Sequence, residues 1–239
     1  MEENLQSEKL VLYLYFITEG IFFFLIKWAE FTCSYTITGK IMYGSIVFNF
    51  CTMLFFYLRY RGDARIPMAL SITLIADYFL TYTNTYCSFG VIFFIIVQII
   101  YGWKVGYNTC NIFFRFVLFL ILTILMYILG LTFSFCFLCG TSMAFLLGNV
   151  FCSWKNFFKK INHDSFNSNK KVLFLISMGL TLFAFCDLSI GLRTIFSGIP
   201  SMGFYYNIMN YSTWVFYLPS QVFLNLSYIS DVRNKSTTH

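Results

Sequence analysis

The chain has 239 residues, of which 59% are hydrophobic and only 11% are charged, and its mean hydropathy is +0.72. An ordinary soluble domain carries about 25% charged residues, so this composition excludes a soluble enzyme and a disordered chain. It also excludes a nucleic-acid-binding module, despite the formal net charge of +6, and we expect no nucleic-acid partner.

Eight apolar runs, separated by polar breaks, follow one another along the chain. A helix needs about 20 residues to cross a bilayer, so eight spans use most of the chain and leave no room for a soluble domain. The sequence therefore predicts an all-α fold: a single integral-membrane domain built as a bundle of eight transmembrane helices. The predicted spans are roughly Leu10–Ile26, Ile41–Leu58, Ile66–Tyr82, Phe89–Trp103, Ile112–Leu129, Leu131–Phe151, Val172–Leu192 and Tyr205–Ser230.

The basic residues predict the orientation of these spans. With eight spans, both tails and the even-numbered loops lie on one side of the membrane. Of the 16 Lys and Arg residues, 13 fall on that side, and Lys27, Lys40 and Arg193 fall on the other. Because basic residues are retained on the cytoplasmic side, we expect both termini in the cytoplasm. The membrane would be the plasma membrane of a prokaryote or the endoplasmic reticulum of a eukaryote.

Neither the cysteines nor the histidines predict a metal site. Cys136 and Cys139 form a CxxC pair, but they lie within a helical run that has no second pair and no nearby histidine. The two histidines of the chain are His163, in the longest loop, and His239, the last residue. A three-histidine zinc hydrolase is therefore excluded, and we expect no metal and no cofactor.

Three acidic residues stand within the apolar runs: Glu19, Asp77 and Asp187. A carboxylate at the centre of a bilayer costs about 2.5–3.5 kcal/mol on insertion scales, and such residues generally face the interior of a bundle and serve a function. Around Asp77, the polar residues Thr73, Thr81 and Asn84 recur at helical spacing, which predicts a polar face. The alternative for each acidic residue is a structural hydrogen bond to a neighbouring helix.

Two further pairs of polar residues share a helical face. Gln98 and Tyr101 are three residues apart in the fourth predicted span, and Tyr217 and Gln221 are four apart in the last, with Pro219 between them. Residues at these spacings lie on one side of a helix. We expect the four to orient a substrate; the alternative for the glutamines is hydrogen bonding between helices.

Two stretches of the sequence resemble the YhhN-type lysoplasmalogenase family, whose members are multi-pass membrane proteins. The first stretch resembles the third and fourth spans of the family, and the second resembles its seventh and eighth spans. They run from Ile66 to Tyr101, including ADYFL at 76–80, FG at 89–90, Phe94 and Gln98, and from Leu182 to Gln221, including LFAFCD at 182–187 and FYLPSQ at 216–221.

The resemblance implies hydrolysis of the vinyl ether bond of a lysophospholipid substrate, a lysoplasmalogen, to a fatty aldehyde and a glycerophospho-alcohol. Vinyl ethers hydrolyse by protonation at carbon followed by capture of an oxocarbenium ion by water. This chemistry needs a protonated acid and an ionised carboxylate, and burial favours the protonated form of a carboxyl group. We therefore expect Asp77 and Asp187 to be the catalytic pair, with Gln98, Tyr101, Tyr217 and Gln221 as substrate-binding residues.

A non-enzymatic membrane protein is the alternative, either a proton-linked transporter of small solutes or a lipid-binding homologue without activity. The position of the two aspartates discriminates between these classes. Carboxyl groups that converge on one site favour a lipid enzyme, a water path past them favours transport, and wide separation with separate partners favours a structural role.

Overall fold

The computed structural model describes residues 2–32, 35–83, 86–106, 109–128, 132–163, 168–197 and 200–236. These residues form eight α-helices, which confirms the prediction of an all-α protein. A π-helical turn (Tyr78–Tyr82) continues α3, and a short 3-10 helix (Pro200–Met202) precedes α8. The helices are α1 (Glu2–Thr32), α2 (Tyr35–Tyr60), α3 (Arg65–Asp77), α4 (Cys87–Val105), α5 (Thr109–Ile128), α6 (Phe133–His163), α7 (Ser168–Ser197) and α8 (Gly203–Ser236).

Each predicted span falls on one of these helices, with α3 and the π-turn together making the third. The predicted limits Leu129 and Leu131 lie outside the described residues. Most helices extend beyond the apolar run that predicted them, because the polar residues at their ends continue the helix. The apolar runs therefore located the helices correctly and underestimated their length.

Five stretches are long and apolar enough to cross a membrane, and the apolar part of α5 is shorter. The helices α3 and α8 do not reach this standard among the described residues: α3 has only 13 residues before the π-turn, and α8 carries many polar side chains. The length and apolar composition of these helices are those of an integral membrane protein. The five stretches are Leu10–Thr32, Ile37–Tyr60, Cys87–Val105, Phe133–Ile161 and Lys170–Ser197.

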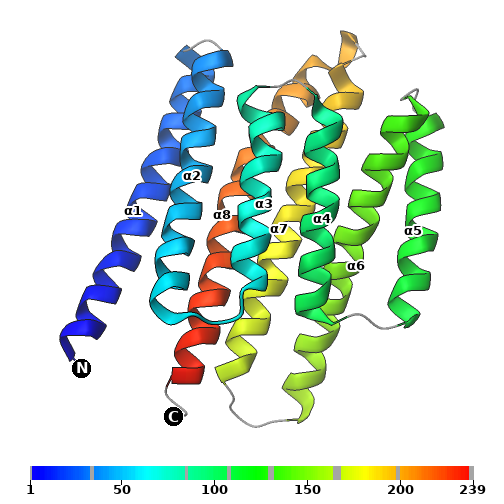
Figure 1. Ribbon diagram of the computed structural model, residues 1–239. Helices are drawn as coiled ribbons and strands as arrows, with labels where there is room; N and C mark the ends of the chain where they lie inside the picture. The colour runs from blue at the N-terminus through cyan, green and yellow to red at the C-terminus, as the bar shows by residue number, and fades with distance from the viewer. Residues whose placement is uncertain are drawn as a thin grey trace.

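The helices lie side by side, and both ends of the chain are at the same end of the bundle (Figure 1). Five of them form a closed ring, because α3 contacts α4, α4 contacts α6, α6 contacts α7, α7 contacts α8, and α8 contacts α3. Outside the ring, α5 packs on α6, and α1 and α2 pack beside α8 and α3. The outer helices expose large apolar side chains such as Phe24, Phe31 and Phe113, a surface suited to lipid.

Two glycines let neighbouring helices of the ring approach closely. A Cβ atom on Gly90 of α4 would lie 3.1 Å from the carbonyl oxygen of Ala76 on α3. A Cβ atom on Gly179 of α7 would lie 3.2 Å from the carbonyl oxygen of Ser220 on α8. Both contacts are next to a predicted site residue, Asp77 in the first case and Gln221 in the second, so the glycines help to place these residues.

An ion-pair network joins the ring to the loop between α2 and α3. Lys104 at the end of α4 lies 2.8 Å from Asp63 in this loop and 2.9 Å from Asp231 on α8, and Arg65 lies 2.8 Å from Asp63. Burial by itself raises the pKa of Asp63, but hydrogen bonds from Arg65 and Lys104 outweigh it and hold that pKa well below its usual range. The network ties this loop to α4 and α8.

Candidate functional site

Asp77 is the last residue of α3, and the π-turn begins immediately after it. A π-turn adds a residue to one turn of a helix and is frequent at functional sites. Thr81 lies within the π-turn, four residues after Asp77, and Asn84, the other residue of the predicted polar face beyond Asp77, lies outside the described residues. The carbonyl oxygen of Thr81 faces Gly39 of α2.

The carboxyl group of Asp77 is buried and joined to α8. The hydroxyl of Tyr217 donates a hydrogen bond to its Oδ2 atom, and the two side chains are 5% and 4% exposed. The ring of Tyr217 packs against Trp214 and Phe183, with centroid distances of 5.3 and 6.1 Å. These contacts hold the tyrosine in place at the point where α3 and α8 close the ring of helices.

Asp187 of α7 lies close enough to Asp77 for the two carboxyl groups to interact electrostatically. Its side chain is half-buried. In the described part of the chain it receives no hydrogen bond, whereas Asp77 has the hydroxyl of Tyr217. The two aspartates therefore lie within electrostatic range of each other, and their environments differ: one carboxyl is enclosed and hydrogen-bonded, and the other is partly accessible.

The other predicted residues lie on α4 and α8, and Gln98, Tyr101 and Gln221 are 0%, 1% and 3% exposed. Gln98 Nε2, Tyr101 OH and Gln221 Nε2 have no hydrogen-bond partner among the residues that the structure describes. Buried polar groups in proteins are almost always hydrogen-bonded, so these three unpartnered groups are available to water or a ligand.

Two residues that the sequence did not single out are connected to this group. Asn149 of α6 donates from Nδ2 to the main-chain oxygen and to Oε1 of Gln98, at 2.7 and 3.1 Å. Arg115 of α5 donates to Oδ1 of Asn149 at 2.7 Å. Arg115 is one of the basic residues whose distribution predicts the orientation, but it is 4% exposed and lies between α5 and α6. The signals available in the sequence were an arginine and an asparagine within apolar runs.

Glu19 belongs to a different polar cluster, between α1, α2 and α8. Its carboxylate accepts a hydrogen bond of 3.0 Å from Ser45 of α2. One turn away along the same helices, Tyr15 donates to Asn49 at 3.0 Å and accepts from Asn225 of α8 at 3.1 Å. The structure therefore separates Glu19 from the two aspartates and bonds it to the outer helices.

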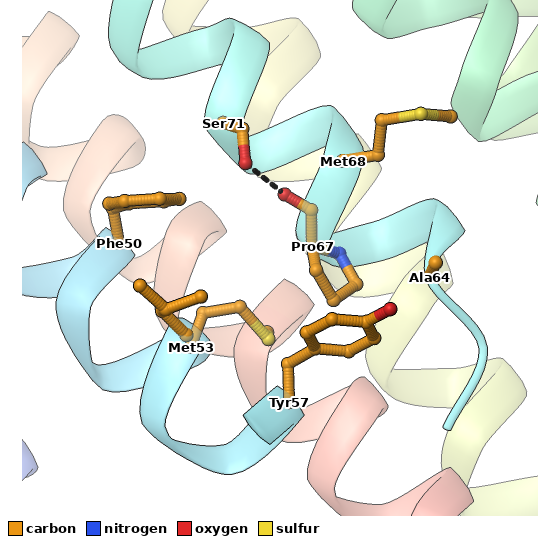
Figure 2. Close-up of a pocket in the computed structure, with 8 residues that line it drawn as sticks. Phe50, Met53, Tyr57, Ala64, Pro67, Met68 and Ser71 are labelled. Carbon is orange, nitrogen blue, oxygen red and sulfur yellow. Dashed lines mark hydrogen bonds between the residues drawn. The ribbon is translucent and has the colours of Figure 1, made fainter. Parts of the chain in front are cut away.

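An apolar groove of about 250 Å³ lies between α2 and α3. Figure 2 shows that the hydroxyl of Ser71 is hydrogen-bonded to the carbonyl oxygen of Pro67, so this polar group is satisfied within α3. None of the six predicted site residues lines the groove, although Ser71 precedes Asp77 on the same helix. The lining residues are Phe50, Met53, Leu54, Tyr57, Ala64, Pro67, Met68 and Ser71.

The six predicted residues thus come from α3, α4, α7 and α8, four of the five helices of the ring, and the fifth, α6, supplies Asn149. Comparison of the chain with known protein families, characterised proteins and solved structures found no match.

Proposed function

We propose that this protein is a membrane-embedded hydrolase that cleaves the vinyl ether bond of a lysoplasmalogen, releasing a fatty aldehyde and a glycerophospho-alcohol. The observation that supports this best is that Asp77 and Asp187, on two helices of the ring, lie within electrostatic range of each other in two different environments. The resemblance of the same segments to YhhN-type lysoplasmalogenases points to the same chemistry.

The reaction assigns one part to each carboxyl group. A protonated carboxyl transfers its proton to the vinyl carbon beta to the ether oxygen, and the positive charge is shared between the neighbouring carbon and that oxygen. The other group, as a carboxylate, stabilises this cation and takes a proton from the water that attacks it. The resulting hemiacetal breaks its bond to the glycerol oxygen to give the aldehyde and the alcohol, so that one water is consumed and no proton is gained or lost overall.

The substrate would meet two kinds of surface. The unpartnered donors on Gln98, Tyr101 and Gln221 suit the oxygen atoms of the glycerol and of the attacking water. The apolar groove between α2 and α3 suits the hydrocarbon chain, since Ser71 lies six residues before Asp77 on α3, about 9 Å along the helix axis. A lysolipid has this combination of one apolar chain and a compact polar head.

The proposed topology is eight spans with both termini in the cytoplasm. The uneven distribution of basic residues and the position of both chain ends at one end of the bundle (Figure 1) support it. In this topology α3 and α8 span the membrane although they are less apolar, because polar side chains such as Thr73, Gln221 and Asn225 are buried against other helices. Protease protection of tags placed at each terminus tests this: cytoplasmic exposure of both tags is expected, and exposure of one on the opposite side would overturn it.

Aldehyde release from a lysoplasmalogen by the purified protein tests the proposed activity. D77N and D187N are expected to lower the rate by about 100-fold or more, the usual contribution of a general acid or base. D231N is the matched control, because it makes the same chemical change in the ion-pair network. Absence of aldehyde release by the wild-type protein would refute the activity, and full activity in D77N or D187N would refute the two-carboxylate mechanism.

A further inference from the structure

A chain of hydrogen bonds runs from Arg115 through Asn149 to Gln98, and its donors and acceptors can be arranged in only one direction. A guanidinium group has donors and no acceptor, so the atom of Asn149 that faces Arg115, at 2.7 Å, must be its oxygen Oδ1. A second donation from Arg115, to the carbonyl oxygen of Phe145 at 2.7 Å, holds the guanidinium against α6. The amide of Asn149 therefore cannot turn over without placing its own donor against that of Arg115.

The orientation of Asn149 determines that of Gln98. With Oδ1 facing Arg115, the Nδ2 group of Asn149 faces α4 and donates to Oε1 of Gln98 at 3.1 Å and to the main-chain oxygen of the same residue at 2.7 Å. The oxygen of the Gln98 side chain is thus bound on the α6 side. Its Nε2 atom is left buried and without a partner in the described part of the structure.

We propose that Arg115, acting through Asn149, is a positioning residue that makes Gln98 a hydrogen-bond donor toward the interior of the helix ring. The Nε2 group of Gln98 then favours a ligand atom that accepts a hydrogen bond and disfavours one that donates. This inference rests on the proposed function, in which the accepting atom is an oxygen of the glycerophosphate part of a lysophospholipid.

Two substitutions reverse this polarity without removing a side chain. N149D keeps an oxygen for Arg115 but offers no donor to Gln98, so the Gln98 amide turns to donate to it and presents its oxygen to the site. N149D also loses the hydrogen bond to the main-chain oxygen of Gln98, whereas Q98E keeps it. Q98E keeps an oxygen facing Asn149 and replaces the amide nitrogen by a second oxygen. The control is T181V, which removes the 2.9 Å hydrogen bond from Trp154 to Thr181 between α6 and α7 of the same ring.

The first measurement is binding of a saturated 1-O-alkyl lysophosphatidylcholine, which has no vinyl ether to hydrolyse, to the protein in nanodiscs. N149D and Q98E are each expected to weaken binding by at least about tenfold, the loss of one net hydrogen bond, and T181V by less than about twofold. The 1-O-alkyl glycerol without phosphate identifies the oxygen: weakened binding of both ligands assigns a glycerol oxygen, and weakened binding of the phospholipid alone assigns the phosphate. Unchanged affinity in N149D and Q98E would overturn the proposal.

The second measurement needs neither ligand nor activity. Each single substitution leaves one hydrogen bond possible between the two side chains, whereas N149D combined with Q98E places two carboxylates against each other. The loss of the hydrogen bond to the main-chain oxygen of Gln98 is common to N149D and the double variant, so it cancels in the comparison. The melting temperature of the double variant is therefore expected to fall by more than the sum of the two single changes at neutral pH. Additive changes would overturn the proposal, whether or not the wild-type protein releases aldehyde.

Discussion

Replacement of Gly148 by alanine is expected to destabilise the protein, because the added methyl group would occupy space that Arg115 now fills. A Cβ atom at this position would lie 2.6 Å from Cγ and 2.8 Å from Cζ and Nε of Arg115. Carbon atoms in favourable contact are about 3.5–4.0 Å apart. The arginine cannot simply swing aside, because hydrogen bonds to Phe145 and Asn149 hold its far end.

The expected loss has three contributions. Insertion of a methyl group into a packed interior costs about 1–3 kcal/mol, and the displaced guanidinium gives up at least one charged hydrogen bond worth about 1.5–3 kcal/mol. Alanine in place of glycine within a helix returns about 1 kcal/mol. We therefore expect the free energy of unfolding to fall by about 2–5 kcal/mol, and the melting temperature by at least about 4 °C.

Thermal unfolding in detergent, followed by tryptophan fluorescence, measures this change. Gly191→Ala is the matched control, since it makes the same substitution within α7 where a Cβ atom meets nothing within 4 Å, and it is expected to melt at or above the wild-type temperature. If the melting temperatures of the two variants agree within about 1 °C, the packing of Gly148 against Arg115 is not the constraint that we infer.

Three further changes test the site and its surroundings. Y217F removes the hydroxyl that donates to Asp77, and aldehyde release is expected to fall about tenfold or more; an unchanged rate would contradict a role for this hydrogen bond. E19Q keeps an acceptor for Ser45 and removes a buried charge, so thermal unfolding is expected at or above the wild-type temperature with activity retained; loss of activity in the folded variant would place Glu19 in the site. Because the pKa of Asp63 is lowered in the folded protein, the stability that wild type has over D63N is expected to be complete above the ordinary pKa of 3.8 and to decline as pH falls below it; a decline that begins near neutral pH in a melting series would contradict the ion-pair network.

The positions of the helices could be predicted from the sequence, because an apolar run between polar breaks has few alternatives to a helix. The scarcity of charge also singled out Asp77 and Asp187, since a carboxylate in an apolar run is costly unless it is enclosed. The same reasoning applied to Glu19 did not predict its surroundings: all three residues have the same local pattern, but Asp77 and Asp187 lie within electrostatic range of each other, whereas Glu19 bonds to Ser45 of α2. Local sequence does not encode which helix a carboxyl group will face.

The π-turn after Asp77 could not be predicted either, because the run Tyr78–Tyr82 reads as ordinary helix. It begins immediately after Asp77, and the carbonyl oxygen of Thr81 within it faces Gly39. The packing of Arg115 could not be predicted for a similar reason: near the start of an apolar run, an arginine that stays at the membrane surface and an arginine that packs against a neighbouring helix look alike.

By itself, the sequence determined that this is an all-α protein of apolar helices, and it singled out some of the polar side chains that those helices enclose, such as Asp77 and Gln98. It could do so because both properties depend on the solvation of each residue, which its own chemistry dictates. Only the tertiary structure decided that α3, α4, α6, α7 and α8 close into a ring, that Asp77 meets Tyr217, and that Arg115 acts on Gln98 through Asn149. These pairings depend on the rotation and close approach of helices, which small residues such as Gly90 and Gly148 permit and which local sequence does not specify.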